Sequence, residues 1–162
     1  MIYALVDKET LNQKAVSLKK FLQHISTFPN IPILQYRNKL ASLEEKKEDL
    51  EIIRKHYHGT LIINDNIELI AYADGLHLGQ EDLRKYSHDL QEAVSLVRQK
   101  IGTKLLGLST HDKTEISEAN TLDLDYIGLG AYRATNTKSE ANVGGKTLLE
   151  AAKHSKHPVG II

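Results

Sequence analysis

The sequence contains no cysteine, and this absence excludes several kinds of chemistry. Without thiols the chain can form no disulfide, offer no thiolate to a metal and supply no cysteine nucleophile. The absence is also typical of proteins in the reducing cytoplasm, which is where we expect this chain to act.

An excess of one charge sign is missing as well, because 21 Lys and Arg residues balance 21 Asp and Glu residues. No basic surplus therefore points to a nucleic-acid partner or to an anionic membrane. No apolar run approaches the roughly 18 residues that a membrane span requires. The start from Met1 to Asp7 turns acidic too early for a signal peptide. With 162 residues, 41% of them hydrophobic, the chain is expected to form a single globular domain.

Short apolar runs of β character alternate seven times with longer stretches of helical period. The expected strands are Ile2–Val6, Ile31–Tyr36, Thr60–Ile63, Gly75–Leu78, Lys104–Leu108, Tyr126–Leu129 and Val159–Ile162. This alternation predicts parallel strands joined by helical crossovers. Runs such as Leu61–Ile63 are apolar throughout, which is typical of strands buried on both faces. A doubly wound sheet and a closed barrel both satisfy these patterns.

Three of the intervening segments have amphipathic patterns that predict helices. The stripes are Leu11, Ala15, Leu18, Leu22 and Ile25; then Leu43, Leu50, Ile53 and Tyr57; then Leu90, Ala93, Val94, Val97 and Ile101. The charged run from Glu44 to Glu48 in the second segment is expected to face solvent.

Polar residues collect where the expected strands end, and the second strand supplies the basic ones. Gln35, Arg37 and Lys39 alternate with a period of two, so in extended backbone they point the same way. Two cations and an amide suit a diphosphate or another dense anion. An unrelated exposed cluster is the alternative.

The next two strand ends supply carboxylates. Asp65 follows the third strand beside Asn64, and Asp82 follows the fourth. Carboxyl ends of parallel strands share one rim, and Mg²⁺ prefers one or two carboxylates together with phosphate oxygens and water. The set therefore predicts a magnesium diphosphate site, with a helix N-cap or turn as the alternative for Asp82.

Six motifs stand in the order and spacing of a known family. They are Gln35-x-Arg37-x-Lys39, Asn64-Asp65, the run from Asp74 to Asp82, Gly107-x-Ser109-x-His111, the run from Asp125 to Gly130, and Thr135-x-Thr137-Lys138. Together, from Tyr3 to Ile162, they resemble thiamine-phosphate synthase and the related thiazole tautomerases. The resemblance implies an α/β fold, the TIM-type (β/α)8 barrel.

The resemblance also implies roles for individual residues. Asp65 and Asp82 would bind Mg²⁺, the expected cofactor. The catalytic groups would be Arg37, Lys39, Ser109 and Lys138, which hold the diphosphate of hydroxymethylpyrimidine diphosphate. The substrate-binding groups would be Gln35, Asn64, His77, His111, Thr135 and Thr137. The partners would be these small-molecule substrates, and a homo-oligomer stays open.

In the family, diphosphate leaves first and gives a pyrimidinylmethyl cation, which the thiazole nitrogen then attacks. Negative charge develops on the departing diphosphate, and preplaced cations stabilise it. No nucleophilic side chain is needed, which agrees with the absence of cysteine.

Two other activities remain open. A thiazole tautomerase would use His111 as its acid–base group, whereas His77 is expected to be a packed residue that orients its neighbours. A non-catalytic relative that binds thiamine precursors is favoured by Ala131 and Ala134, which replace prolines usual in the family. The chain stops at Ile162, so we expect a C-terminally incomplete barrel that lacks the last β/α unit.

Overall fold

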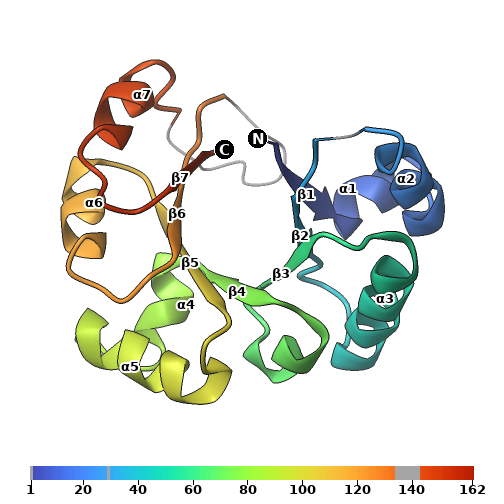
Figure 1. Ribbon diagram of the computed structural model, residues 1–162, viewed down its shortest axis with the longest axis horizontal. Coiled ribbons are helices and arrows are strands. Elements are labelled where there is room, and N and C mark those ends of the chain that lie inside the picture. Colours follow the sequence, from blue (N-terminus) through green and yellow to red (C-terminus); the bar gives the residue numbers. More distant parts are fainter. Residues whose placement is uncertain (1, 29, 134–142) are drawn as a thin grey trace. The chain divides into compact units, whose positions relative to one another are not determined.

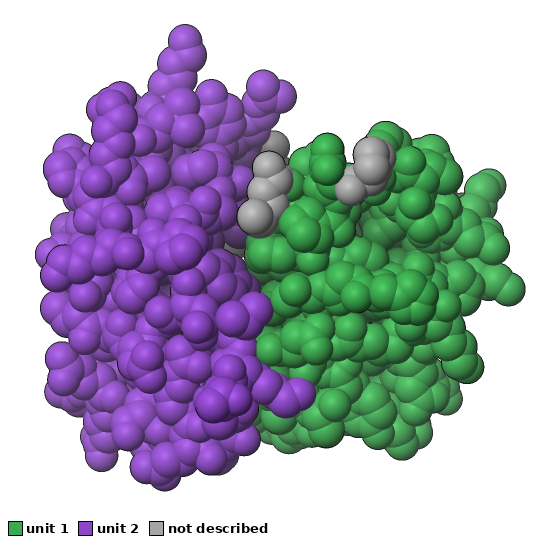
Figure 2. Space-filling model, in the orientation of Figure 1, with its two compact units in different colours: residues 1–76 green, residues 77–162 purple. Residues whose placement is uncertain are grey.

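The computed structural model describes residues 2–28, 30–133 and 143–162, and it divides into two compact units (Figure 2). The first unit is Met1–Leu76 and the second is His77–Ile162. The division falls within strand β4 (Gly75–Leu78). Each unit is an α/β structure with parallel strands.

The first unit contains three parallel strands in consecutive order (Figure 1). They are β1 (Tyr3–Asp7), β2 (Ile33–Arg37) and β3 (Thr60–Asn64). The register places Asp7 beside Arg37, and Tyr36 beside Ile63. Because the strands are parallel and in register, their carboxyl ends lie at one edge.

Three α-helices lie on one side of these strands (Figure 1). They are α1 (Lys8–Gln13), α2 (Leu18–Ile25) and α3 (Leu43–His56), and a 3₁₀ helix, η1 (Ile67–Tyr72), follows β3. The expectation of one continuous helical face from Leu11 to Ile25 is wrong. The helix is interrupted at Ala15, which is exposed and has a φ of 53°. Ser17 then caps the second helix, α2. A serine that can accept the Lys20 N–H competes with a continuous helix at this point.

Helix α3 begins with a capping box, in which Ser42 and Glu45 each bond the backbone of the other. Its buried face contains Leu50 and Ile53 as expected, but Leu43 is exposed. The charged run is not wholly solvated, because Lys46 is buried. Its Nζ lies 2.9 Å from Oδ1 of an asparagine in the segment after β3, Asn66, which satisfies the charge.

The second unit contains β5 (Leu105–Thr110), β6 (Tyr126–Leu129) and β7 (Val159–Ile161), again parallel and consecutive. Its helices are α4 (Gln80–Arg84), α5 (Leu90–Ile101), α6 (Lys113–Ala119) and α7 (Thr147–Ala152). In the register, Gly107 lies beside Tyr126 and Ser109 beside Gly128. The third amphipathic stripe is confirmed by α5, which buries Ala93, Val94, Val97 and Ile101.

The interior of each unit is formed by the apolar strands. Leu34, Leu61 and Ile62 are completely buried in the first unit, and Leu106 and Ile127 are buried in the second. Every expected strand has a counterpart, with ends that differ by at most two residues. None of the described helices is long and apolar enough to cross a membrane.

Candidate active site

Strand β2 presents Gln35 and Arg37 on the side opposite the helices. The Tyr36 hydroxyl donates to Asp49 of α3 at 2.7 Å, so Tyr36 faces the helical layer and its two neighbours face away. Gln35 is 3% exposed, and its buried Nε2 has no hydrogen-bond partner among the described residues. A buried amide without a partner is costly, so this donor is suited to a ligand atom.

Arg37 is held by Asp7 at the end of β1. The Arg37 guanidinium makes an ion pair with the Asp7 carboxylate, and both side chains are largely buried. The same carboxylate caps α1 by accepting the Thr10 N–H at 2.8 Å. Burial raises the pKa of Asp7, but the hydrogen bonds from Thr10 and the Arg37 charge outweigh it and leave the pKa below its usual value. The pair therefore holds the guanidinium in place at the strand ends.

Lys39 lies beyond the strand, because β2 ends at Arg37. The alternation of side chains in extended backbone, which gives Gln35 and Arg37 a shared direction, therefore does not extend to Lys39. Lys39 is exposed, and its backbone N–H donates to the Glu9 carboxylate at 2.8 Å. Its ammonium group is on the surface near the start of the loop that leads to α3.

Asn64 and Asp65 end β3 in a tight turn. Asp65 has a φ of 64°, a left-handed conformation that is uncommon outside glycine. Such strained backbone concentrates at functional sites. The next residue, Asn66, accepts a hydrogen bond from the ammonium group of Lys46 in α3. This bond ties the turn to that helix. Asn64 follows the residue that pairs with Tyr36, so it ends its strand level with Arg37.

In the second unit, Asp82 lies in the first turn of α4 and is 27% exposed. Gly79, not Asp82, occupies the N-cap position of this helix. The Asp82 carboxylate accepts the Lys85 ammonium group at 2.6 Å. The Asp82 carboxylate is therefore accessible, and it contacts Lys85 at the surface.

His77 connects a residue near the end of β5, Ser109, with the first residue of β6, Tyr126. Its Nδ1 lies 3.0 Å from the Tyr126 hydroxyl, and its Nε2 lies 3.0 Å from the Ser109 Oγ. His77 is 3% exposed, as expected for a packed residue, and burial lowers its pKa to about 4. The imidazole is therefore neutral at physiological pH.

His111, just after β5, has a carboxylate partner. Its Nδ1 lies 2.8 Å from the Glu115 Oε2, and the same oxygen accepts the His111 backbone N–H at 2.8 Å. Both side chains are about one-third exposed. A histidine oriented by a carboxylate is an arrangement suited to proton transfer.

The remaining expected residues, Thr135, Thr137 and Lys138, lie outside the described residues. Within the described ranges, no three His, Asp or Glu side chains gather closely enough to bind a metal by themselves. A Mg²⁺ ion needs only one or two carboxylates when it also binds phosphate oxygens and water. Carboxylate oxygens, such as those of Asp65 in the first unit or Asp82 in the second, are ligands of the kind that this ion prefers.

Comparisons with known proteins assign this chain to a family. A family model described as thiamine monophosphate synthase matches residues 2–162. The chain belongs to the thiamine monophosphate synthase family.

Relatives of this family agree with the assignment. A thiamine-phosphate synthase from Caldicellulosiruptor bescii is 39% identical over 136 residues, which are 79% of this chain and 58% of that protein. A thiamine-phosphate synthase from Clostridium tetani is 32% identical, over 99% of this chain and 72% of its own length. The chain thus spans less than two thirds of the length of the Caldicellulosiruptor protein.

A solved structure confirms the TIM-type α/β fold expected for the family. The structure of a thiamine phosphate pyrophosphorylase from Pyrococcus furiosus matches with a TM-score of 0.71. The match covers 97% of this chain and 72% of that structure at 21% sequence identity, so it concerns the fold alone.

Three residues that contact expected site residues had no role predicted from the sequence: Asp7, Tyr126 and Glu115. Asp7 could have been found because it ends the first strand, as the other candidates end theirs. Tyr126 begins its strand, and Glu115 lies inside a helix, so neither position carries that signal.

Proposed function

We propose that this chain carries the active-site residues of a Mg²⁺-dependent thiamine-phosphate synthase. The reaction joins hydroxymethylpyrimidine diphosphate to hydroxyethylthiazole phosphate and releases diphosphate. The observation that carries the proposal is the family match across residues 2–162, together with the charged residues retained at the strand ends. The expected partners are these two small molecules.

The residues of the first unit would bind the pyrimidine diphosphate. Arg37, held by Asp7, and Lys39 would neutralise the phosphate oxygens, and Asn64 would donate to them. The buried Nε2 of Gln35 would donate to a pyrimidine nitrogen, which would satisfy its missing hydrogen bond.

The second unit carries further residues expected to bind the substrates. Ser109 would donate a hydrogen bond from its hydroxyl group to the diphosphate, and Lys138 would add a positive charge. Thr135 and Thr137 would contact the thiazole phosphate. His77 would orient Ser109, to which it lies within hydrogen-bond distance.

The chemistry requires positioned charge rather than a nucleophilic side chain. The carbon–oxygen bond breaks with its electron pair going to the diphosphate, and the thiazole nitrogen then forms the new carbon–nitrogen bond. Mg²⁺, held by Asp65 and Asp82, would supply additional positive charge to the leaving group. Arg37, Lys39 and Lys138 would stabilise the same developing charge from fixed positions.

A second candidate activity, thiazole tautomerase, is favoured by the pairing of His111 with Glu115. The ionised carboxylate can only accept, so it holds the Nδ1 proton and orients the imidazole for proton transfer. A tautomerase needs no diphosphate and no Mg²⁺, so the two activities are separable by their requirements.

The test is the release of diphosphate from hydroxymethylpyrimidine diphosphate, with and without thiazole phosphate and Mg²⁺. We expect release that requires all three components and yields thiamine phosphate. We also expect Asp65→Ala and Lys138→Ala to abolish it. Lys146→Ala and Asp123→Ala, at exposed positions, are the matched controls and should retain activity.

Normal turnover in both Asp65→Ala and Lys138→Ala would refute the assigned site. If no diphosphate is released but the thiazole phosphate is isomerised, and His111→Asn or Glu115→Gln stops that isomerisation, the tautomerase replaces the synthase.

A further inference from the structure

Ser109 is held through its hydroxyl and its carbonyl group by the segment that begins at His77. Its hydroxyl oxygen lies 3.0 Å from His77 Nε2, and its carbonyl oxygen accepts the Gln80 Nε2–H at 2.9 Å. The side chain is therefore oriented by the protein and does not rotate freely. An oriented hydroxyl presents either a proton or a lone pair to a ligand, and the difference decides whether it binds an anion.

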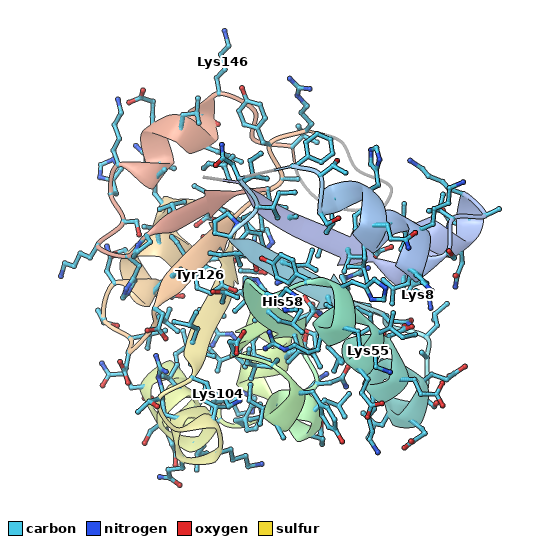
Figure 3. All side chains as sticks on the ribbon, turned by 45° about the vertical axis from the view of Figure 1, so that its right-hand side comes forward. Lys8, Lys55, His58, Lys104, Tyr126 and Lys146 are labelled. Carbon is cyan, nitrogen blue, oxygen red and sulfur yellow. The ribbon has the colours of Figure 1, made fainter. Side chains whose placement is uncertain are left out.

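Two glycines create the space for this arrangement. A β carbon at Gly107 would lie 2.1 Å from the Tyr126 Cζ, so only glycine lets the tyrosine ring cross β5. A β carbon at Gly128 would lie 3.0 Å from the His77 Cε1, a tighter approach than an ordinary contact. The Tyr126 ring thus occupies space that the neighbouring strand β5 leaves open at Gly107 (Figure 3 labels Tyr126), and the His77 ring lies against the space left at Gly128 of β6.

The two hydrogen bonds that join Tyr126, His77 and Ser109 allow only two consistent arrangements of their protons. A neutral imidazole has one N–H donor and one acceptor nitrogen, and the low pKa of His77 keeps the ring neutral. In the first arrangement, Tyr126 donates to Nδ1 and Nε2–H donates to Ser109. In the second, Ser109 donates to Nε2 and Nδ1–H donates to Tyr126.

The two arrangements differ in what Ser109 offers. In the first, the hydroxyl oxygen is already an acceptor for His77, so its own proton remains available to a ligand. In the second, the proton is used on His77, and the ligand meets only lone pairs, which repel an anion. A phenol is also a stronger donor than an aliphatic hydroxyl, which favours the first arrangement.

We infer that Tyr126, His77 and Ser109 form a hydrogen-bond relay in which Tyr126 donates to Nδ1, Nε2–H donates to Ser109, and Ser109 donates to a phosphate oxygen of the ligand. Tyr126 and His77 are positioning residues, and of these three residues only Ser109 contacts the ligand. The identity of that ligand as diphosphate rests on the proposed function, but the direction of the relay does not.

The first test is the tautomer of His77, measured by nitrogen NMR of protein labelled with ¹⁵N-histidine, with the His77→Gln variant used for assignment. We expect a protonated Nε2 and an unprotonated, hydrogen-bonded Nδ1. In Tyr126→Phe, the Nδ1 resonance should move to higher chemical shift as its donor is lost. A protonated Nδ1 in the wild-type chain, or an unchanged Nδ1 in Tyr126→Phe, overturns the relay.

The second test is the binding of inorganic diphosphate with Mg²⁺, measured by calorimetry. Tyr126→Phe, which keeps the ring in its place, should weaken binding roughly tenfold. In a Ser109→Ala background the same change should have no further effect, because the relay acts only through Ser109. Tyr86→Phe, a tyrosine whose ring faces Lys100 in the same unit, is the matched control and should bind as the wild type does.

These tests separate the relay from the proposed function. A wild-type affinity in Tyr126→Phe, or an equal loss in the Ser109→Ala background, contradicts the relay even if the chain makes thiamine phosphate. If the wild-type chain binds no diphosphate, the proposed ligand is wrong, and the His77 tautomer and its response to Tyr126→Phe still decide the relay.

Discussion

Asp7 combines two roles in one carboxylate, because it caps α1 through Thr10 and pairs with the Arg37 guanidinium. Asparagine caps helices about as well as aspartate, so Asp7→Asn removes the charge while it keeps the cap. We expect this change to lower the free energy of unfolding at pH 7 by roughly 2 kcal/mol, since it leaves a largely buried guanidinium without its counter-charge. Urea unfolding measures the difference.

The pH dependence of the same variant follows from the lowered pKa of Asp7. A carboxylate with a lowered pKa stabilises the fold above the pKa of the unfolded chain, about 4, and the contribution is lost as the pH falls through the lower folded value. The gap between wild type and Asp7→Asn should therefore close in acid. Asp89→Asn, at the exposed cap of α5, is the matched control and should change stability little at any pH. A gap that stays constant down to acid would contradict the ion pair.

His77 should make the fold sensitive to mild acid. Its pKa is about 4 in the folded chain and about 6.5 in the unfolded chain, so the unfolded state takes up a proton first as the pH falls. Between these two values the wild type should lose roughly 3 kcal/mol of stability through this group.

The variant His77→Gln cannot titrate in this range. Its overall stability should be lower, but the slope of its unfolding free energy against pH should be shallower between pH 6.5 and 4. His154→Gln, at an exposed position, provides the comparison and should keep the wild-type slope. Parallel slopes for His77→Gln and the wild type would show that His77 is not buried as described.

At the scale of elements, β5 depends on a glycine for its contact with β6. Gly107→Ala places a methyl group into the Tyr126 ring, so either the ring or the strand must move. Overpacking of this kind costs about 1–3 kcal/mol. The matched change, Gly160→Ala in β7, meets nothing closer than 3.8 Å and should be nearly neutral. Thermal unfolding of both variants tests the contrast, and equal midpoints would refute it.

The strands were predictable because burial on both faces leaves short apolar runs, and their short length between turn residues favours strands over helices. The break between α1 and α2 was not. The stripe from Leu11 to Ile25 keeps a helical period across the break, and only the φ of Ala15 and the cap at Ser17 reveal it. The burial of Lys46 was not predicted either. A lysine in a charged run is buried only when an acceptor such as Asn66, 20 residues away, forms a hydrogen bond with it.

At the scale of the whole molecule, the candidate site was predictable as a set of strand ends and not as a set of contacts. Arg37, Asn64 and Asp65 lie at the ends of neighbouring strands because parallel strands share a carboxyl edge. The partners of some site residues, such as Tyr126 for His77, lie far away in the sequence, so no local spacing predicts them. The single barrel domain remains a prediction.

Ligand binding should stabilise the chain as a whole if the proposed site is correct. A ligand that binds only the folded state raises the unfolding free energy by about 2.7 kcal/mol at 100 times its dissociation constant, which corresponds to a midpoint increase of roughly 5–10 °C. We expect that increase with diphosphate and Mg²⁺ together, and much less with either alone, because Asp65 and Asp82 would bind the metal only with phosphate oxygens present. Asp65→Asn and Asp82→Asn should each lose most of the increase, whereas Asp123→Asn, on the surface, should retain it. An increase of the same size without Mg²⁺, or in both site variants, would mean that the diphosphate binds through the basic residues alone.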